Sequence, residues 1–448
     1  MASSLSLSVP LLFFLLIITS SVAKTSTRPK ALLLQVTKDA KTLLLQVTKD
    51  AKTLQYVTQV SQRTPLVPVK LTLDLGGDYM WVNCERGYSS STYRPAPCGS
   101  AACQLLNTTS CTTECYSAPA PDCYNNTCGH GPTNSVANTG TSGQLGADVL
   151  AIQSTDGKNV LQVVTVPRLY FICGNNFIEA GLASGVTGMA GLGRTGASLP
   201  AQLSSYFRFD RKFALCLSSS TRSSGVVFFG NGPYTLLPNV DASSSLTYTP
   251  LIINPVTENG FLGDASPKYF IGVTSIKIND KRVRFNETLL TIDAEGYGGT
   301  TISTADPYTV LESSIYSAVV TAFVNAMPKN VQRVPSVAPF GACFSSKNIS
   351  STRLGPAVPS IDLVLQNKNV YWRIFGANSM VEVKEDVLCL GFVEARTDFR
   401  PRFAVVIGGH QIEDNLLQFD LSTSRLGFSS SLLGRSTTCA NFNFTSTA

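Results

Sequence analysis

The chain has few histidines and few charged residues. Only two histidines, His130 and His410, occur among its 448 residues, and 14% of the residues are charged. A Ser-His-Asp hydrolase needs a histidine beside its nucleophile. Here His130 lies in a cysteine-rich stretch and His410 follows an Ile-Gly-Gly sequence, so we expect both to be structural or exposed.

The sequence also lacks basic clusters interleaved with aromatics, and it has no later apolar run long enough to span a membrane. Nucleic acid and membrane are therefore not predicted partners, and nothing predicts a cofactor. The formal net charge of +6 would attract acidic surfaces, cell-wall polysaccharide among them.

The first residues have the composition of an export signal. Leu5 to Ser20 is an apolar run broken by Ser, Thr and Pro10, and Ser21-Val22-Ala23 offers small residues for cleavage. The usual basic start is missing. We nevertheless expect residues 1–23 to be a signal peptide and the mature, secreted, extracellular protein to begin near Lys24.

Twelve cysteines form an even set, which in an exported chain favours disulfides over metal ligation, even for Cys123 and Cys128 near His130. Six bridges can form, but the sequence leaves their pairing open. Seven of the cysteines lie within residues 84–128 and predict a stapled, loop-rich insertion. The set is Cys84, Cys98, Cys103, Cys111, Cys115, Cys123, Cys128, Cys173, Cys216, Cys343, Cys389 and Cys439.

Asn-x-Ser/Thr sequons, which accept N-linked sugar in exported proteins, agree with this route. Such sequons also arise by chance, so the sequence does not say which of them carry sugar. They begin at Asn107, Asn125, Asn286, Asn348 and Asn443.

The length and composition predict two mainly β lobes. About 425 mature residues exceed what one core usually supports. Short runs rich in Val, Ile, Leu, Thr and Phe alternate with turn residues, which is the rhythm of many short strands. We expect an N-terminal lobe over residues 24–240 and a C-terminal lobe over residues 241–448, joined around Asn231 to Pro255.

Particular segments carry this prediction. Expected strands are Val67 to Asp74, Val160 to Val166, Phe213 to Cys216, Gly225 to Phe229 and Lys268 to Ile278. Expected helices are Ser198 to Tyr206, where Pro200 suits a first turn after a serine cap, and Ser313 to Met327.

One segment is duplicated. Leu32 to Thr42 reads LLLQVTKDAKT, and Leu43 to Thr53 repeats it letter for letter. A single perfect pair is no solenoid, which needs several stacked units. It indicates either a recent local duplication, with one copy redundant, or a duplicate in the gene model.

The two halves echo each other. Leu71-Thr-Leu-Asp-Leu-Gly is followed later by Gly188-Met-Ala-Gly-Leu-Gly, and in the second half Gly299-Thr-Thr-Ile-Ser-Thr-Ala-Asp is followed by Phe403-Ala-Val-Val-Ile-Gly-Gly. An aspartic protease needs one carboxylate from each half, because two such acids share a proton and activate a water. Asp74 in the first half satisfies this need.

The second half does not. Ser303 stands where the matching aspartate belongs, and Asp306 lies three residues too far along the chain. Asp74-Leu-Gly-Gly resembles the first active turn of the pepsin-like proteases, but Leu75 replaces the usual Thr and Gly77 the usual Ser. The flap that this resemblance implies, Asn134 to Gly143, has no tyrosine. The sequence therefore predicts no peptide cleavage, and Asp74 is expected to hydrogen-bond its own turn.

Several motifs together resemble one plant family, the pepsin-like glycosidase inhibitors, which comprises wheat-type xylanase inhibitors, extracellular dermal glycoproteins, xyloglucan-specific endoglucanase inhibitors and basic 7S globulins. The resemblance implies a bilobal pepsin-like aspartic protease fold that is catalytically incomplete, and secretion to the apoplast or cell wall. It is strongest for the dermal glycoprotein and endoglucanase-inhibitor branch. The motifs are Leu73-Asp-Leu-Gly-Gly, Trp81-Val-Asn-Cys, Gly185-Val-Thr-Gly-Met-Ala-Gly-Leu-Gly-Arg, Lys212-Phe-Ala-Leu-Cys-Leu, Pro307-Tyr-Thr-Val-Leu-Glu, Val337-Ala-Pro-Phe-Gly-Ala-Cys and Ile407-Gly-Gly-His-Gln-Ile-Glu-Asp-Asn.

The resemblance also implies a target and a contact surface. Members of this family bind secreted microbial glycosidases, which hold two carboxylates in an open cleft that an arginine can bridge. The segment Glu394 to Phe403 carries Arg396, Arg400 and Arg402. Arg402 matches the family position best, Arg333 is the expected second contact and Arg400 a further one. A microbial xyloglucanase is the expected partner. A xylanase target, or storage or peptide-hormone binding as in the globulins, remains the alternative.

Overall fold

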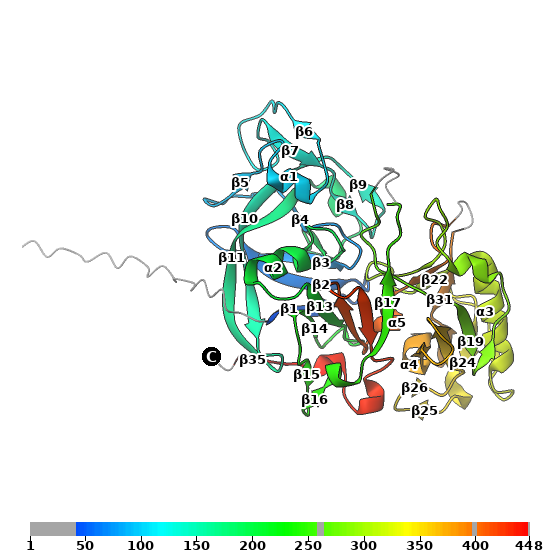
Figure 1. Ribbon diagram of the computed structural model, residues 1–448. Helices are drawn as coiled ribbons and strands as arrows, with labels where there is room; N and C mark the ends of the chain where they lie inside the picture. The colour runs from blue at the N-terminus through cyan, green and yellow to red at the C-terminus, as the bar shows by residue number, and fades with distance from the viewer. Residues whose placement is uncertain (1–41, 258–263, 397–400, 447–448) are drawn as a thin grey trace, which may run out of the picture. The chain divides into compact units, whose positions relative to one another are not determined.

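The computed structural model describes residues 42–257, 264–396 and 401–446, which form mainly β structure (Figure 1). The predicted signal peptide and the first repeat copy, up to residue 41, lie outside the described residues. Thr42, the last residue of the first copy, begins β1 (Thr42–Lys49), and the second copy forms the rest of this strand and the turn after it. Asp50 fixes that turn, because its Oδ1 accepts hydrogen bonds from the amides of Lys52 and Thr53.

One large sheet draws strands from both halves of the chain. β1 pairs with β14 (Gly225–Gly230) and with β2 (Tyr56–Gln62), and its leucines and Val47 are buried. The other strands of this sheet are β3 (Val67–Asp74), β4 (Trp81–Asn83), β5 (Arg94–Pro95), β6 (Cys111–Thr112), β7 (Thr127–His130), β10 (Gly143–Thr155), β11 (Asn159–Gly174), β12 (Gly188–Gly191), β13 (Lys212–Cys216), β17 (Thr247–Ile252), β18 (Phe270–Ile271), β21 (Thr300–Ile302), β22 (Thr309–Leu311), β31 (Phe392–Glu394), β32 (Val405–Ile407), β33 (Leu416–Asp420), β34 (Arg425–Phe428) and β35 (Asn443–Ser446).

The remaining strands form smaller sheets. Two four-stranded sheets lie in the C-terminal half, and three strand pairs complete the set within the described residues. The four-stranded sheets are β20 (Lys281–Arg282), β19 (Ser275–Ile278), β27 (Ile361–Val364), β28 (Tyr371–Ile374), and β23 (Arg333–Val334), β24 (Cys343–Ser345), β30 (Val387–Leu390), β29 (Met380–Lys384). The pairs are β8 (Thr133–Asn134) with β9 (Thr139–Gly140), β15 (Thr235–Leu236) with β16 (Val240–Asp241), and β25 (Ser351–Thr352) with β26 (Gly355–Pro356).

Helices are short, apart from α3 (Ser313–Ala326). The Glu312 carboxylate accepts hydrogen bonds from the first amides of α3, and Ile315, Val319 and Phe323 face the core at a spacing of one helical turn. The others are α1 (Ala101–Leu105), α2 (Leu199–Phe207), α4 (Gly376–Ser379) and α5 (Gly409–Ile412), with the 3₁₀ turns η1 (Phe177–Glu179), η2 (Ala242–Ser245), η3 (Glu287–Leu290), η4 (Ser346–Asn348), η5 (Leu433–Arg435) and η6 (Cys439–Asn441).

Most predicted elements are confirmed, with two differences. The segment Lys268 to Ile278 is broken into β18 and β19 rather than forming one strand. Ser198 precedes α2 as expected, but its hydroxyl donates to the Thr195 carbonyl instead of capping the helix. The boundary at residue 240 stays a prediction.

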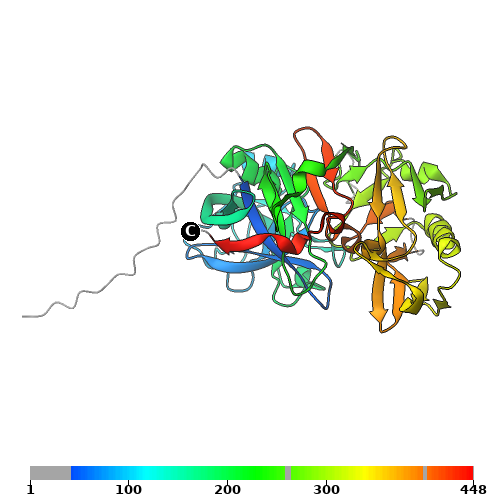
Figure 2. The same ribbon diagram turned by 90° about the horizontal axis from the view of Figure 1, so that it is seen from below.

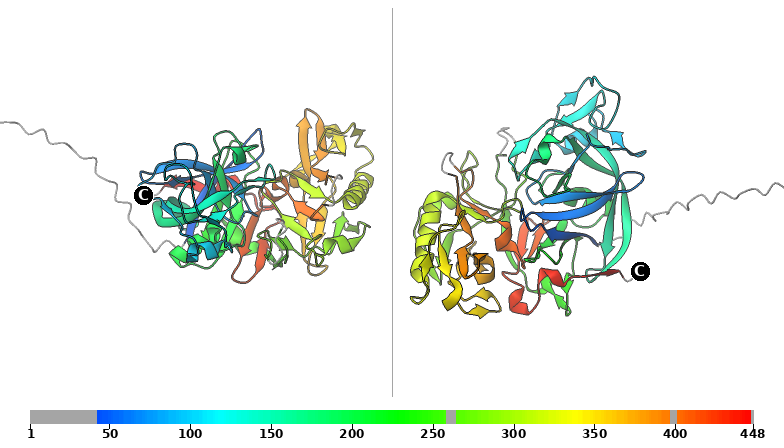
Figure 3. Two further views of the ribbon diagram at one scale, coloured as in Figure 1. Left: turned by 90° about the horizontal axis from the view of Figure 1, so that it is seen from above. Right: turned by 180° about the vertical axis from the view of Figure 1, so that it is seen from behind.

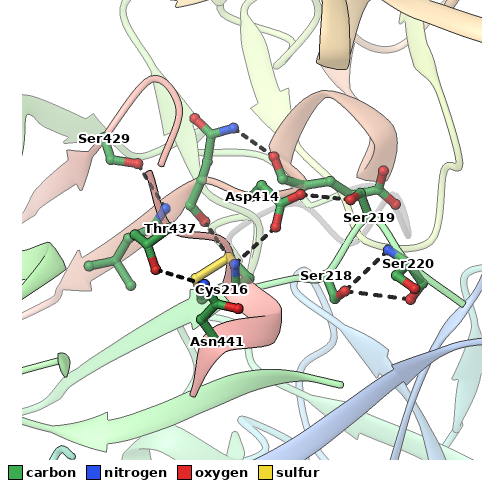
Figure 4. Close-up of a disulfide and its surroundings, with 12 residues drawn as sticks. Cys216, Ser218, Ser219, Ser220, Asp414, Ser429, Thr437 and Asn441 are labelled. Carbon is green, nitrogen blue, oxygen red and sulfur yellow. Dashed lines mark hydrogen bonds between the residues drawn. A yellow bond between two sulfur atoms is a disulfide. The ribbon is translucent and has the colours of Figure 1, made fainter. Parts of the chain in front are cut away.

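The end of the chain returns to the N-terminal half. β13 pairs with β33 along its whole length, and β35 runs parallel to β11. In Figure 2 the red C-terminal segment lies along the blue and green strands. The buried Cys216–Cys439 disulfide fixes this return, and Figure 4 shows Asp414 beside it, accepting hydrogen bonds from Ser219 Oγ and the Cys439 amide.

All twelve cysteines lie in described residues and pair, which confirms the predicted six bridges. Three bridges staple the predicted insertion, drawn in cyan at one end of the N-terminal half in Figures 1 and 3. The pairs are Cys84–Cys173, Cys98–Cys111, Cys103–Cys128, Cys115–Cys123, Cys216–Cys439 and Cys343–Cys389. Within the described residues, no helix has the length and apolarity to cross a membrane.

Candidate functional site

Asp74 and Ser303 occupy equivalent places in the two halves. β3 runs parallel to β12, with Asp74 opposite Gly191. β21 runs parallel to β32, with Ile302 opposite Ile407, so Ser303 is the next residue in the same arrangement. The echo seen in the sequence is therefore a repeated pair of parallel strands, each ending in a tight turn.

The Asp74 carboxylate is buried, with 7% of the residue exposed. Its Oδ1 accepts the Gly76 amide at 3.0 Å, as expected for a turn aspartate, and its Oδ2 accepts the Ser135 hydroxyl at 2.8 Å. A Cβ on Gly77 would sit 3.0 Å from both the carboxylate and the Gly191 backbone. Glycine at position 77 leaves this close approach unstrained, whereas a larger side chain would push its neighbours away by a few tenths of an ångström.

Ser303 repeats the turn without the acid. Its hydroxyl oxygen accepts the amides of Ala305 and Asp306, each at 3.1 Å. A serine hydroxyl thus takes the place of the carboxylate oxygen in the turn hydrogen bond, but it has no ionisable proton near neutral pH.

A one-sided contact joins the two turns. The Thr304 hydroxyl donates to the Leu73 carbonyl at 2.8 Å and accepts the Leu75 amide at 3.0 Å. Leu75 has no hydroxyl to return the contact. The turns are held together, but only from the C-terminal side.

A cleft of about 680 Å³ opens over these turns. It lies between the turns and the β8–β9 hairpin, which falls within the expected flap. Asp74, Ser303 and Asp306 line it, together with Ser135 and Lys268. Ser135 was not singled out from the sequence, because no sequence signal places a flap serine against an aspartate 61 residues away.

Arg402 is half-buried beside β32. Its guanidinium carbon lies 4.5 Å from the centre of the Tyr297 ring, and Nη2 makes a long contact of 3.5 Å with the Thr257 carbonyl. Arg333 is exposed on β23, and its Nη2 donates to the Gly341 carbonyl at 3.2 Å. Arg400 lies outside the described residues, and Arg396 is described but its role stays a prediction.

The histidines have structural partners. His410 Nδ1 lies 3.3 Å from the Glu413 carboxylate, and its Nε2 lies 3.0 Å from the Met380 carbonyl. His130 packs edge-on against Tyr79, and burial lowers its pKa. In the part of the chain that the structure describes, no group of three or more His, Cys, Asp or Glu residues could hold a metal ion.

The sequon asparagines lie at the surface, and Asn443 is partly covered. Sugar would attach to Nδ2, which in Asn348 and Asn443 already donates to Asn330 and Asn159. In Asn125 and Asn286 it is Oδ1 that is engaged, since it accepts a hydrogen bond from the amide of Cys115 and of Thr288, respectively. Glycosylation of all five stays a prediction.

Comparison with known proteins identifies the family of this chain. Residues 56–231 match the family model "Xylanase inhibitor N-terminal", and residues 268–430 match "Xylanase inhibitor C-terminal". The chain belongs to this xylanase-inhibitor family. Its members share the bilobal, pepsin-like fold that the two repeated turns indicate.

Individual members of the xylanase-inhibitor family are similar over almost the whole chain. "Probable aspartic proteinase GIP2" of Nicotiana benthamiana is 59% identical over 100% of both chains, and "Basic 7S globulin" of Glycine max is 39% identical over 98% of this chain and 97% of its own. The crystal structure of edgp matches with a TM-score of 0.89 and 55% identity, covering 92% of this chain and 100% of its own. Conglutin gamma from lupine seeds matches with a TM-score of 0.79 and 38% identity, covering 91% and 100%.

Proposed function

We propose that this protein is a secreted, non-catalytic inhibitor of a microbial xyloglucan-specific endo-β-1,4-glucanase. Arg402 inserts between the catalytic carboxylates of the target, and Arg333 makes a second contact. The observation that carries this proposal is the Arg402 guanidinium, which is stacked on Tyr297 while its Nε has no hydrogen-bond partner among the described residues. A carboxylate of the target would pair with this stacked guanidinium in bidentate geometry.

The protein does not cleave peptides. The pair of acids that would share a proton is incomplete, because Ser303 supplies a hydroxyl where the second carboxylate is needed. The name of one relative, probable aspartic proteinase, describes that relative. Family members with inhibitor and globulin names support a non-catalytic assignment for this chain.

We prefer inhibition of an endoglucanase to a storage role because of the branch of the family that this chain resembles. Identity to edgp is 55%, against 38% to conglutin gamma, and the motifs resemble the endoglucanase-inhibitor branch. Storage or peptide-hormone binding, as in the globulins, is the second candidate, favoured by the 39% identity to basic 7S globulin. Bulk accumulation in seeds would support storage, and wound-induced protein in wall fluid would support inhibition.

Inhibition constants against a panel of fungal xyloglucanases and xylanases test the proposal. Arg402→Ala should weaken xyloglucanase inhibition by roughly 30-fold to several thousand-fold, because removing a buried charge partner typically costs about 2–5 kcal/mol. Arg402→Lys should recover part of the loss, since a point charge cannot form the two-pronged contact.

Arg222→Ala is the matched control, because Arg222 is an exposed arginine of the N-terminal half. It should leave inhibition unchanged. If Arg402→Ala combined with Arg333→Ala inhibits as strongly as the wild type, the proposed contact is wrong. Inhibition of xylanases alone would move the target to the other enzyme class.

A further inference from the structure

The turn from Asp293 to Gly298 lies directly against the Arg402 side chain, and we call it the arginine rest. Tyr297 places its ring centre 4.5 Å from the guanidinium carbon. The Gly298 amide donates to the Arg402 carbonyl at 2.9 Å. The rest therefore contacts both the backbone and the side chain of Arg402.

Gly296 lets the guanidinium approach the rest closely. Its φ is +78°, and a Cβ there would sit 2.8 Å from Arg402 Nη2 and 2.7 Å from Asn254 Oδ1. A left-handed conformation and this lack of space both require glycine. The guanidinium therefore lies where a side chain at position 296 would otherwise be.

Hydrogen bonds within the arginine rest and from the neighbouring Asn254 hold its conformation. Asp293 Oδ1 accepts the amides of Glu295 and Tyr297, at 3.1 and 2.7 Å. Beneath it, the fully buried Asn254 donates from Nδ2 to the Gly296 carbonyl at 2.9 Å. A turn held this way keeps the Tyr297 ring in one position.

The Tyr297 ring packs on the face of the guanidinium, but the N–H groups along its edge make few hydrogen bonds. Nε is buried and has no partner among the described residues, and Nη2 makes the one long contact with Thr257. A carboxylate that pairs with the guanidinium edge replaces one long contact by charge-assisted hydrogen bonds, so it gains affinity. Stacking on an aromatic ring engages the face of a guanidinium and not its in-plane donors.

We propose that the arginine rest pre-orients Arg402 for a carboxylate of the target enzyme, with Tyr297 and Gly296 as positioning residues. This inference rests on the proposed function. The Arg402 side chain is then ordered before the target binds, so association loses less side-chain entropy. The rest would thus set, through Arg402, how tightly a target's acidic cleft is bound.

Substitutions at Tyr297, with inhibition constants as the readout, test this. Tyr297→Leu should weaken inhibition by about twofold to thirtyfold, the range of a cation–π contact worth about 0.5–2 kcal/mol. Tyr297→Phe keeps the ring and should weaken inhibition less than Tyr297→Leu does. In an Arg402→Ala background, Tyr297→Leu should have no further effect.

Tyr371→Leu is the matched control, because Tyr371 stacks under Arg373 at 4.9 Å on β28. It should leave inhibition unchanged. A second readout needs no enzyme: the NMR signal of Arg402 Nε–H should carry a ring-current shift that Tyr297→Leu removes and Tyr297→Phe keeps.

The outcomes separate the two proposals. If Arg402→Ala does not weaken inhibition, the proposed function is wrong. If Arg402→Ala weakens it but Tyr297→Leu changes neither the inhibition constant nor the Arg402 signal, the arginine rest is wrong while the proposed function stands.

Discussion

Asp74 and Ser303 make the same hydrogen bond, in which a side-chain oxygen accepts the amide two residues ahead. Carboxylates and hydroxyls both stabilise such turns. The backbone conformation of an active-site turn can therefore persist after its acid is gone. At the scale of single residues, the fold of this protein and the chemistry of a protease are separable.

Restoring the acid alone should not restore the enzyme. Ser303→Asp should show no pepstatin-sensitive cleavage of denatured haemoglobin at acid pH. The reasons are that Leu75 offers no hydroxyl to match Thr304, that Ser135 already donates to Asp74, and that the flap has no tyrosine. Cleavage by this variant would show that the missing carboxylate is the sole defect.

Glu413 is the second residue with a testable role. It is 2% exposed, and its carboxylate lies 2.6 Å from Lys49 Nζ and accepts the Tyr56 hydroxyl at 2.7 Å. Glu413→Gln leaves the Lys49 ammonium unpaired and should lower the free energy of unfolding by about 3–5 kcal/mol in urea titrations at pH 7. Asp386→Asn, in the exposed pair with Lys347, should cost less than about 1 kcal/mol.

The effect of Glu413 should depend on pH. Burial alone would raise the pKa of Glu413, but the hydrogen bond and charge of His410 and the charge of Lys49 outweigh burial and lower it from 4.5. A lowered pKa stabilises the fold above pH 4.5, and this stability is lost as the pH falls through the lower folded value. The difference between wild type and Glu413→Gln should therefore shrink below pH 4.5; a constant difference would contradict this.

At the scale of elements, the sequence patterns worked where the signal is local. Alternation and turn residues located β3 and β14 nearly to the residue, and Pro200 located α2. The helices α4 and α5 were not predicted, because four residues are too few to show a helical period.

The disulfides show a contrast between elements. Cys343–Cys389 closes 46 residues in the core, whereas Cys115–Cys123 closes 8 in an exposed loop. Loop entropy gives stabilisation of about 4 and about 2.5 kcal/mol respectively. Replacing both cysteines by alanine should therefore lower the melting temperature more for the first pair. Equal losses would mean that loop length and burial do not govern these bridges.

At the scale of the whole molecule, the sequence could not show the contacts that join segments far apart in the chain. Tyr56 meets Glu413 across 357 residues, and Ser135 meets Asp74 across 61. Neither the cysteine pairing nor the arginine rest has a periodic or local signal. The family resemblance predicted the candidate arginines, whereas only the structure shows the turn that contacts Arg402.

Removing the last residues should affect the opposite half of the molecule. Deleting residues 439–448 removes β35 and the partner of Cys216. The bridge alone closes a loop worth about 5 kcal/mol. We expect the shortened chain to expose a titratable thiol and to lose hydrogen-exchange protection in β11 and β13. Unchanged protection in those strands would contradict a structural role for the tail.

The returning tail has a consequence for synthesis. β13 finds one neighbour, β14, soon after it is made, but its other neighbour β33 and the partner of Cys216 follow much later. Cys216 precedes Cys439 by 223 residues, roughly 10 to 45 s at ribosomal speeds of about 5–20 residues per second. Until then the nascent chain carries an open strand edge and a free thiol, both of which invite wrong partners. The N-terminal half therefore completes its fold only after Cys439 has been synthesised.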